Sequence, residues 1–306
     1  MEIQKITPEY FPKLLQEISD PPKQLYYKGK CPFLSNDGGN LGRHIPSNSS
    51  LIYLAVVGTR KCTIYGKEAC RKIISGLAGY NFVIVSGIAL GIDAVAHQAA
   101  LDAKLPTIAI PGSGIDWSVF HPRTNHKLAK DILEPTTGGP AGCLMSELGP
   151  KCPAGIHTFV QRNRIIAGLC QGTLIIEAAE KSGSLITAEM AIETGRDVFA
   201  VPGSIFNENS KGTNMLIKDG AAPVHSAKDI IDFYGLNQRQ SEINFEKKTD
   251  HLPLLAQKIL GELKEPTTRD DLVRQLKISS SEINPLLTML QFDGFIKDSG
   301  GEIFKT

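Results

Sequence analysis

Residues 82–97 read FVIVSGIALGIDAVAH: a short apolar run, a turn with two glycines, and the start of a helical pattern. The run Phe82–Val85 is apolar without alternation, which is typical of a strand covered on both faces. Gly87 and Gly91 follow it, and the segment Ala94–Ala103 is long enough for a helix. Backbone N–H groups at a helix start attract anions, so the stretch predicts a strand, an anion-holding loop and a helix in succession.

The same alternation recurs along the middle of the chain. Segments of helix length, such as Lys67–Leu77 and Leu185–Thr194, separate the apolar runs. This pattern predicts an α/β fold with a doubly wound parallel sheet, whose ligands bind at the carboxyl ends of the strands. The predicted strands are Tyr53–Val57, Phe82–Val85, Thr107–Ile110, Leu144–Met145, Leu174–Ile176 and Val198–Val201.

Composition divides the chain into four segments. Residues 1–50 predict a short helix over 8–18 followed by loops, and residues 51–235 hold the strand–helix alternation. Residues 236–250 are polar and predict a linker, and residues 251–306 predict three helices and a β-hairpin, a winged-helix pattern. These last helices are expected at Pro253–Leu263, Thr268–Leu276 and Ser280–Phe292, and the hairpin at residues 294–305.

Charge and cysteine content narrow the functional classes. The chain has 33 Lys and Arg against 32 Asp and Glu, so a nucleic-acid site would have to be a local basic patch. Its start lacks the pattern of a signal peptide, and no apolar stretch reaches the roughly 20 residues of a membrane span. We expect a cytoplasmic protein with no membrane contact, metal or cofactor. Six cysteines without zinc spacing predict reduced thiols: Cys31, Cys62, Cys70, Cys143, Cys152 and Cys170.

The first predicted strand is followed by Gly58, Thr59 and Arg60. Glycine lets a backbone approach its ligand, threonine offers a hydroxyl, and the arginine fork fits phosphate oxygens. A strand-to-helix turn needs a glycine in any case, so this loop alone does not decide its role.

The second strand is followed by Ser86, Gly87 and Gly91 at a spacing that matches neither the dinucleotide fingerprint nor a Walker loop. NAD and ATP sites of those types are therefore unsupported. Asp93 and His97 lie four residues apart on one helical face and could form a metal or acid–base pair. The favoured alternative is an aspartate at a helix start that bonds its neighbour, because no third ligand or nucleophile is evident.

Two further polar groups come late in the alternation. Arg162, Asn163 and Arg164 are expected to open an apolar helix, where positive charge opposes the helix dipole unless an anion is bound. The alternative is a pair of surface arginines paired with Glu147 or Glu177. Residues 182–184, Ser-Gly-Ser, precede another helix and again suit a phosphate.

Taken together, most strand ends carry Gly, Ser, Thr or Arg, and none carries a nucleophile beside a base. The pattern favours a site that holds a polyanion and disfavours an enzyme. The candidate binding residues are Gly58, Thr59, Arg60, Ser86, Gly87, Gly91, Arg162, Asn163, Arg164, Ser182, Gly183 and Ser184.

Several of these motifs, in order and at matching spacing over about residues 15–235, resemble those of the DNA-processing protein A family, also called Smf. The resemblance rests on the stretches at residues 57–60, 86–97, 162–169, 182–188, 196–203 and 212–221. It implies an extended Rossmann-like domain that binds single-stranded DNA without catalysis. It also implies a homodimer that protects incoming DNA and loads the RecA recombinase in natural transformation. The pocket residues that it implies are Arg60, Ser86, Gly87, Arg162, Asn163 and Arg164.

Three features bear on that family pattern. Only about 50 residues precede the first predicted strand, so we expect the N-terminal helical module of many members to be absent. The stretch Pro153–Thr158 lacks a Lys or Arg that some relatives place there, so Lys151 or protonated His157 would have to substitute. Residues 251–306 carry seven basic and eight acidic side chains, whereas a DNA-reading winged helix is usually basic. We therefore expect this tail to contact protein or to play an accessory part.

The chief alternative is an enzyme similar to Rossmann-like nucleoside monophosphate phosphoribohydrolases, with Glu177, Glu180 or Glu189 acting on a ribose phosphate. The Pro-Gly-Gly-x-Gly-Thr loop of those enzymes is missing from this sequence. An interaction module without nucleic acid is a third possibility.

Overall fold

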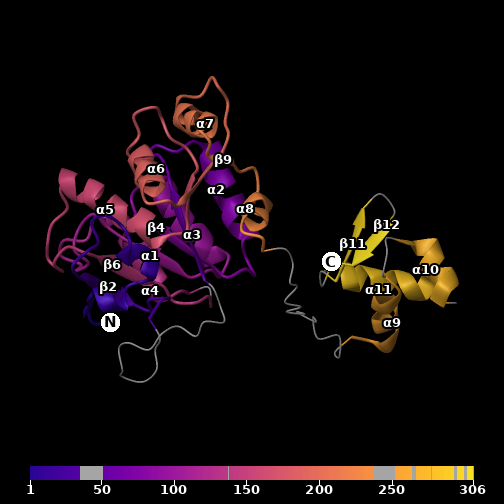
Figure 1. Cartoon of the computed structure of the whole chain (residues 1–306). Helices are drawn as coiled ribbons and strands as arrows, with labels where there is room; N and C mark the ends of the chain where they lie inside the picture. Colours follow the sequence, from indigo (N-terminus) through magenta and orange to yellow (C-terminus); the bar gives the residue numbers. More distant parts are fainter. Residues whose placement is uncertain are drawn as a thin grey trace. The chain divides into compact units, whose positions relative to one another are not determined.

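The computed structural model describes residues 1–34, 51–136, 138–236, 252–263, 267–276, 278–292, 295–299 and 302–305. The chain forms two compact units, Met1–Leu236 and Asn237–Thr306 (Figure 1). The predicted loop over residues 35–50 and nearly all of the predicted linker lie outside the described residues.

A nine-stranded sheet organises the first unit. All six predicted strands are present within a residue or two of their expected bounds. Six of the strand pairs, from β6 across the sheet to β9, are parallel. In spatial order the strands are β1 (Gln4–Ile6), β2 (Leu25–Gly29), β6 (Cys143–Ser146), β5 (Thr107–Ala109), β4 (Phe82–Ser86), β3 (Ile52–Val57), β7 (Gly172–Ile175), β8 (Asp197–Ala200) and β9 (Ala222–Pro223).

The expectation of a wholly parallel sheet is corrected at one edge, where β1 and β2 run antiparallel to their neighbours. In β2 the side chains of Leu25 and Tyr27 are buried while Tyr26 and Lys28 are half-exposed. This alternation suits an antiparallel edge strand and lacks the continuous apolar run by which the central strands were recognised. The sheet is therefore mixed but mostly parallel, and the Rossmann-like α/β fold is confirmed.

Helices cover both faces of the sheet (Figure 1). Alternate residues of β3 enter two separate cores, with Leu54 and Val56 in one and Ala55 and Val57 in the other. The helices against the first core are α2 (Ile64–Gly76), α3 (Ile92–Asp102) and α8 (Ala227–Phe233). Those against the second are α5 (Ile156–Leu169), α6 (Gly183–Glu193) and α7 (Lys211–Lys218); α4 (His126–Leu133) packs beside α3 on β5 and β6.

The helix predicted over residues 8–18 is broken in two, a short 3₁₀ turn at Pro8–Tyr10 and α1 at Lys13–Gln16. Phe11, which precedes Pro12, has extended backbone angles. Proline disfavours the helical conformation of the residue before it, so the helix restarts after Pro12.

The second unit contains the predicted helices and hairpin. Its core includes Ala256, Ile259, Leu272, Ile283 and Leu290. A two-residue strand that the sequence did not predict pairs with the hairpin. Its elements are α9 (Leu254–Glu262), β10 (Thr267–Thr268), α10 (Arg269–Leu276), α11 (Ser280–Phe292), β11 (Ile296–Ser299) and β12 (Glu302–Lys305). Its assignment as a winged helix stays a prediction.

The described part of the chain shows the pairing state of the cysteines and the length of the apolar helices. All six cysteines are free thiols. None of the described helices combines the length and the apolar character needed to cross a membrane.

Candidate nucleic-acid interface

A cavity of about 370 Å³ opens at the carboxyl ends of the central strands. From β3 the chain builds the sheet outward through β4, β5 and β6, then returns to the other side of β3 with β7. Such a reversal leaves a crevice between the loops after the two strands, where ligands of these sheets bind. The sequence candidates that line this cavity are Gly58, Arg60, Arg162, Asn163, Ser182, Gly183 and Ser184.

A second cavity, of about 610 Å³, adjoins the first. Arg60, Ala89 and Phe159 line both cavities, and Gly87 lines the larger one. Its far wall is the segment from Ser118 to Thr124. The two hollows therefore adjoin at the strand ends, with Arg60 and Phe159 at their junction, and together they are called the groove.

Phe159 is a site residue that the sequence analysis did not single out. The Arg60 guanidinium carbon lies 5.0 Å from the centre of the Phe159 ring, and the exposed His121 ring packs edge-on at 5.9 Å. A planar cation on a half-buried aromatic ring offers both a phosphate ligand and a surface on which a base can stack. Phe159 stands just before the arginine pair in the sequence, but one phenylalanine in an apolar helix does not distinguish stacking from core packing.

Arg162 reaches the cavity from inside the protein and is 8% exposed. Its Nη1 donates a hydrogen bond to the carbonyl of Ile110, and its guanidinium packs against Gly87. Burial lowers the pKa of Arg162 to about 10, while nearby Asp93 acts to raise it and Arg60 to lower it. Arg162 is thus still charged at neutral pH and presents a desolvated cation at the cavity wall.

Asp93 organises the loop after β4. Its Oδ2 accepts hydrogen bonds from the backbone N–H groups of Gly87, at 3.1 Å, and Ala89, at 3.4 Å. Burial raises the pKa of Asp93, and Arg162 acts against that rise. His97 instead bonds Thr107 through Nδ1 at 2.8 Å. Asp93 and His97 therefore make hydrogen bonds to different partners and not to each other. Among the described residues, no cluster of three potential metal ligands occurs.

The N-terminus of α6 opens into the smaller cavity. Ser182 caps the helix by accepting the N–H of Ser184, and the two hydroxyl oxygens lie 2.8 Å apart. Gly183 is exposed, and no atom lies within 4 Å of where its Cβ would stand. A helix start with hydroxyls and an exposed glycine is a location suited to hold an anion.

Three sequence candidates line neither cavity and instead support the loops around them. The Ser86 hydroxyl is fully buried and donates to the carbonyl of Val56 at 2.6 Å. Thr59 accepts the N–H of Lys61 and does not line either cavity. Gly91 has a φ of +80°, and a side chain there would overlap the carbonyls of Thr59 and Arg60. These residues fix the two loops against each other.

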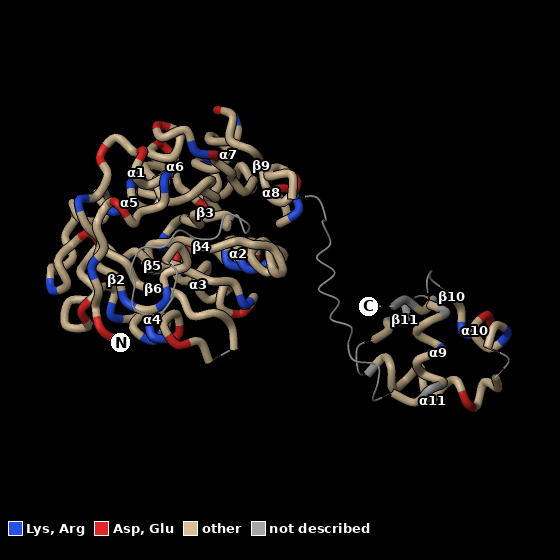
Figure 2. The backbone as a smooth tube through the Cα atoms, turned by 60° about the horizontal axis from the view of Figure 1, so that its bottom comes forward, with Lys and Arg blue, Asp and Glu red and all other residues tan. Residues whose placement is uncertain are grey.

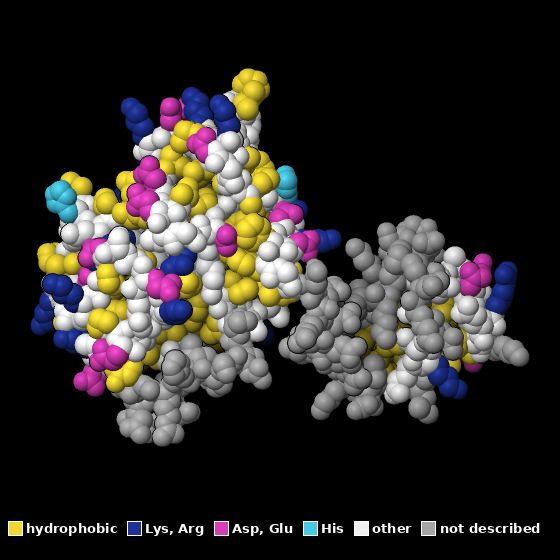
Figure 3. Space-filling model, viewed as in Figure 1, with side chains coloured by type: hydrophobic (Ala, Val, Ile, Leu, Met, Phe, Trp, Pro, Cys, Tyr) yellow, Lys and Arg dark blue, Asp and Glu magenta, His cyan; other side chains and the backbone are white. Residues whose placement is uncertain are grey.

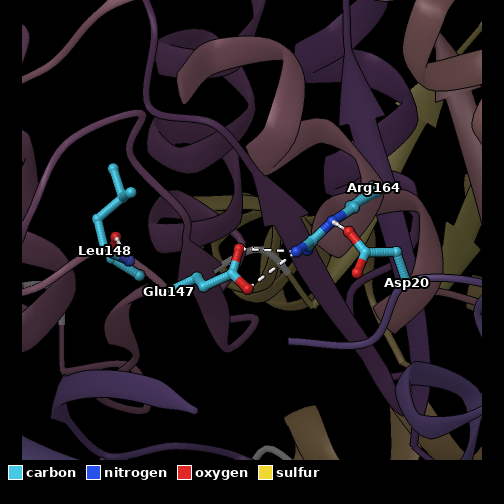
Figure 4. Close-up of polar contacts among 5 residues, drawn as sticks. Asp20, Glu147, Leu148 and Arg164 are labelled. Atoms are coloured by element: carbon cyan, nitrogen blue, oxygen red, sulfur yellow. Dashed lines mark hydrogen bonds and ion pairs between the residues drawn. The ribbon is translucent and has the colours of Figure 1, made fainter. Parts of the chain in front are cut away.

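Arg164 lies away from both cavities. Figure 4 shows its guanidinium between two carboxylates, bonded to Asp20 at 2.9 Å and to both oxygens of Glu147 at 2.8 and 2.9 Å. The alternative interpretation, an arginine paired with Glu147, therefore describes Arg164 but not the buried Arg162. The two arginines also do not open a helix, because α5 begins six residues before Arg162. The prediction of their position in the helix was wrong, since polar residues 157 and 158 obscured the helix start.

The stretch expected to supply a further cation contributes only residues with apolar side chains to the lining of the groove. Pro153, Ala154 and Ile156 line it, whereas Lys151 and His157 do not. An exposed arginine on the opposite wall, Arg123, lines the larger cavity instead. The sequence analysis did not find Arg123, because it comes 14 residues after the end of β5.

The three glutamates that the phosphoribohydrolase alternative would use do not lie together in one site. Glu177 is 1% exposed and its carboxylate accepts the N–H and hydroxyl of Thr63, which caps α2. Glu180 and Glu189 line a separate hollow of about 500 Å³ with Ser182 and Gly183. The groove itself contains Asp93 as a carboxylate, and that group is held by backbone N–H groups.

Comparison with known proteins identifies the family. The sequence profile of DNA recombination-mediator protein A matches residues 2–235. The DNA processing protein DprA of Streptococcus pneumoniae is 43% identical over 227 residues, covering 74% of this chain and 72% of that protein. Its X-ray structure aligns over 76% of this chain and 74% of that one, with a TM-score of 0.65 and 40% identity.

A second solved structure is DNA processing protein A from Helicobacter pylori, described for its mode of binding single-stranded DNA. It aligns with a TM-score of 0.62 and 29% identity over 76% of this chain and 96% of that one. Fold, strand-end groove and sequence agree: the chain belongs to the DNA recombination-mediator protein A family, the DprA and Smf proteins.

Proposed function

We propose that the groove formed by the two adjoining cavities binds single-stranded DNA. The observation that carries this proposal is the junction at which the Arg60 guanidinium lies 5.0 Å from the Phe159 ring centre. Phosphates would contact Arg60, Arg162 and Arg123, and a base would stack on Phe159. The relative from Helicobacter pylori, which binds single-stranded DNA, supports the same ligand.

The wider role proposed is that of a cytoplasmic homodimer in natural transformation, which protects incoming DNA and loads RecA onto it. Family membership supports this role. The protein would act by binding alone, without catalysis or cofactor. A local basic groove fits such a role because the surface elsewhere carries both signs of charge, interspersed on the face seen in Figure 3.

The decisive experiment titrates labelled single-stranded and double-stranded oligonucleotides of mixed sequence at two salt concentrations. The expected result is preferential, salt-weakened binding of the single strand with little sequence dependence. Equal affinity for duplex and single strand would contradict the proposal.

The enzymatic alternative has its own test, because Glu180 and Glu189 share a hollow. Purified protein is incubated with AMP, and released adenine is measured by chromatography. No release is expected, and turnover would contradict a purely binding function.

A further inference from the structure

A small hollow of about 220 Å³ is lined by Trp117, the residue that precedes the groove segment Ser118–Thr124 in the chain. Lys28 on β2, Trp117, and Lys130 on α4 line it. The Lys28 and Lys130 ammonium groups stand 4.8 and 5.9 Å from the centre of the Trp117 ring. Two cations are therefore held at a half-exposed indole, a combination suited to a phosphate and a base together.

The hollow adjoins the proposed DNA path through neighbouring residues of the chain. Ser118, Val119 and Phe120 line the larger cavity, while the adjoining residue Trp117 lines the hollow. The Asp116 carboxylate accepts the N–H and the hydroxyl of Ser118, so this turn is fixed. A strand that leaves the groove past Ser118 would therefore have Trp117 as the next residue beside its path.

The lysines at the hollow are available to an anion. Within the described part of the chain no carboxylate lies within ion-pair distance of Lys28 or Lys130, whereas neighbouring Lys127 is paired with Asp131 at 3.0 Å. Figure 2 shows Lys and Arg segments gathered around β2, β6 and α4. One carboxylate, Glu134, also lines the hollow and opposes an anion there.

The Trp117 indole also packs against two other rings. Its ring lies 5.4 Å from that of Phe120 and 5.5 Å from that of His126, both tilted against it. Lys28 and Lys130 are flexible and can turn from the ring to a phosphate, because a surface cation–π contact is weaker than base stacking. The support of the ring from within leaves its lysine side for a ligand.

We propose that Lys28, Trp117 and Lys130 form a second contact for single-stranded DNA, which the strand reaches only after filling the groove. This inference rests on the proposed function of the groove. It makes the binding length-dependent: a short oligonucleotide occupies the groove alone, and a longer one also covers the hollow.

The test uses the full chain and the fluorescence of Trp117, its one tryptophan. Oligothymidylates of increasing length, from about 4 to about 16 nucleotides, are titrated while anisotropy of a dye on the DNA reports binding. Short oligonucleotides should bind without altering tryptophan emission, and emission should be quenched once a threshold length is passed.

Affinity supplies the second measurement. Lys28→Gln with Lys130→Gln should weaken binding of the longest oligonucleotide about tenfold, the effect of two lost phosphate contacts at low salt. The same change should leave the shortest oligonucleotide within about twofold of wild type, since its phosphates contact only the groove. Glu134→Gln should strengthen binding of the long oligonucleotide only.

A matched control removes the same two charges elsewhere. Lys13→Gln with Lys127→Gln changes lysines that are paired with Glu17 and Asp131, and should bind both lengths like wild type. Tight binding of long oligonucleotides with unchanged emission, or with no loss in the double variant, overturns the second contact alone. Failure of every oligonucleotide to bind overturns the groove proposal as well.

Discussion

The guanidinium of Arg162 lies directly against the Cα of Gly87, so that a methyl group at residue 87 would overlap its nitrogens. Arg162 is buried and bonded to the carbonyl of Ile110, and it has little room to retreat. Because Gly87, directly after β4, has no side chain, the Arg162 guanidinium from α5 can occupy this position.

Gly87→Ala should displace Arg162 and weaken binding of single-stranded DNA by about tenfold, the loss of one well-placed charged contact. Gly149→Ala is the matched control, because Gly149 is exposed, lines neither cavity, and has no atom within 4 Å of where its Cβ would stand. Equilibrium titration of both variants checks the prediction. Wild-type affinity in Gly87→Ala would show that Arg162 does not contact DNA.

Arg60 should contribute to the salt dependence of binding, since it is exposed at the junction of the cavities. Arg60→Gln should lower affinity and reduce the slope of log K against log salt by about 0.7 for one lost phosphate contact. Arg71→Gln removes the same charge from the exposed side of α2 and should leave both quantities unchanged. Equal slopes for the two variants would place the phosphate path elsewhere.

Phe159 should act on bases and not on phosphates. Phe159→Ala should cost about 1–3 kcal/mol of binding free energy, the range for one stacked base, with the salt slope preserved. The measurement is the same titration repeated at several salt concentrations. An abasic oligonucleotide should bind wild type and Phe159→Ala equally, and a difference between them would contradict a stacking role.

Arg164 should matter for stability and little for DNA. Arg164→Gln leaves the partly buried Glu147 without its partner, and we expect a loss of about 1–3 kcal/mol in the free energy of unfolding. Asp20→Asn removes only the exposed partner and should cost less than about 1 kcal/mol. Urea unfolding measures both. A large loss of DNA affinity in folded Arg164→Gln would restore this arginine to the binding site.

His97 should make the fold sensitive to mild acid. Burial lowers the pKa of His97 from 6.5 to about 3, so the unfolded chain takes up a proton that the folded protein excludes. Above pH 6.5, His97 is neutral in both states and does not change the free energy of unfolding. As the pH falls from 6.5 towards 3, proton uptake by the unfolded chain lowers that free energy by at most about 1.4 kcal/mol per pH unit.

The check is the free energy of unfolding at neutral pH and at about pH 5, compared between wild type and His97→Gln. The variant should lose less stability over this interval, and other titrating groups cancel in the comparison. His121→Gln, which changes an exposed histidine, should behave like wild type. An identical loss in wild type and His97→Gln would refute this origin of the acid sensitivity.

The alternation of strands and helices follows from the sequence alone, and so does the edge of the sheet at which the candidate groove lies. Continuous apolar runs can be satisfied only between two covering layers, and the glycines at residues 58, 87 and 91 occur where loops must approach closely. The antiparallel edge strand β2 was missed, since its half-buried alternation is short and ambiguous.

Only the tertiary structure decided which arginine faces the groove. Arg162 and Arg164 stand two positions apart on α5, about 200° around the helix axis, and therefore point in opposite directions. One packs on Gly87, and the other bonds Glu147 and Asp20, which lies 144 residues earlier in the chain. A local pattern of charges does not encode such distant partners, because the fold brings them together through the packing of whole helices and strands.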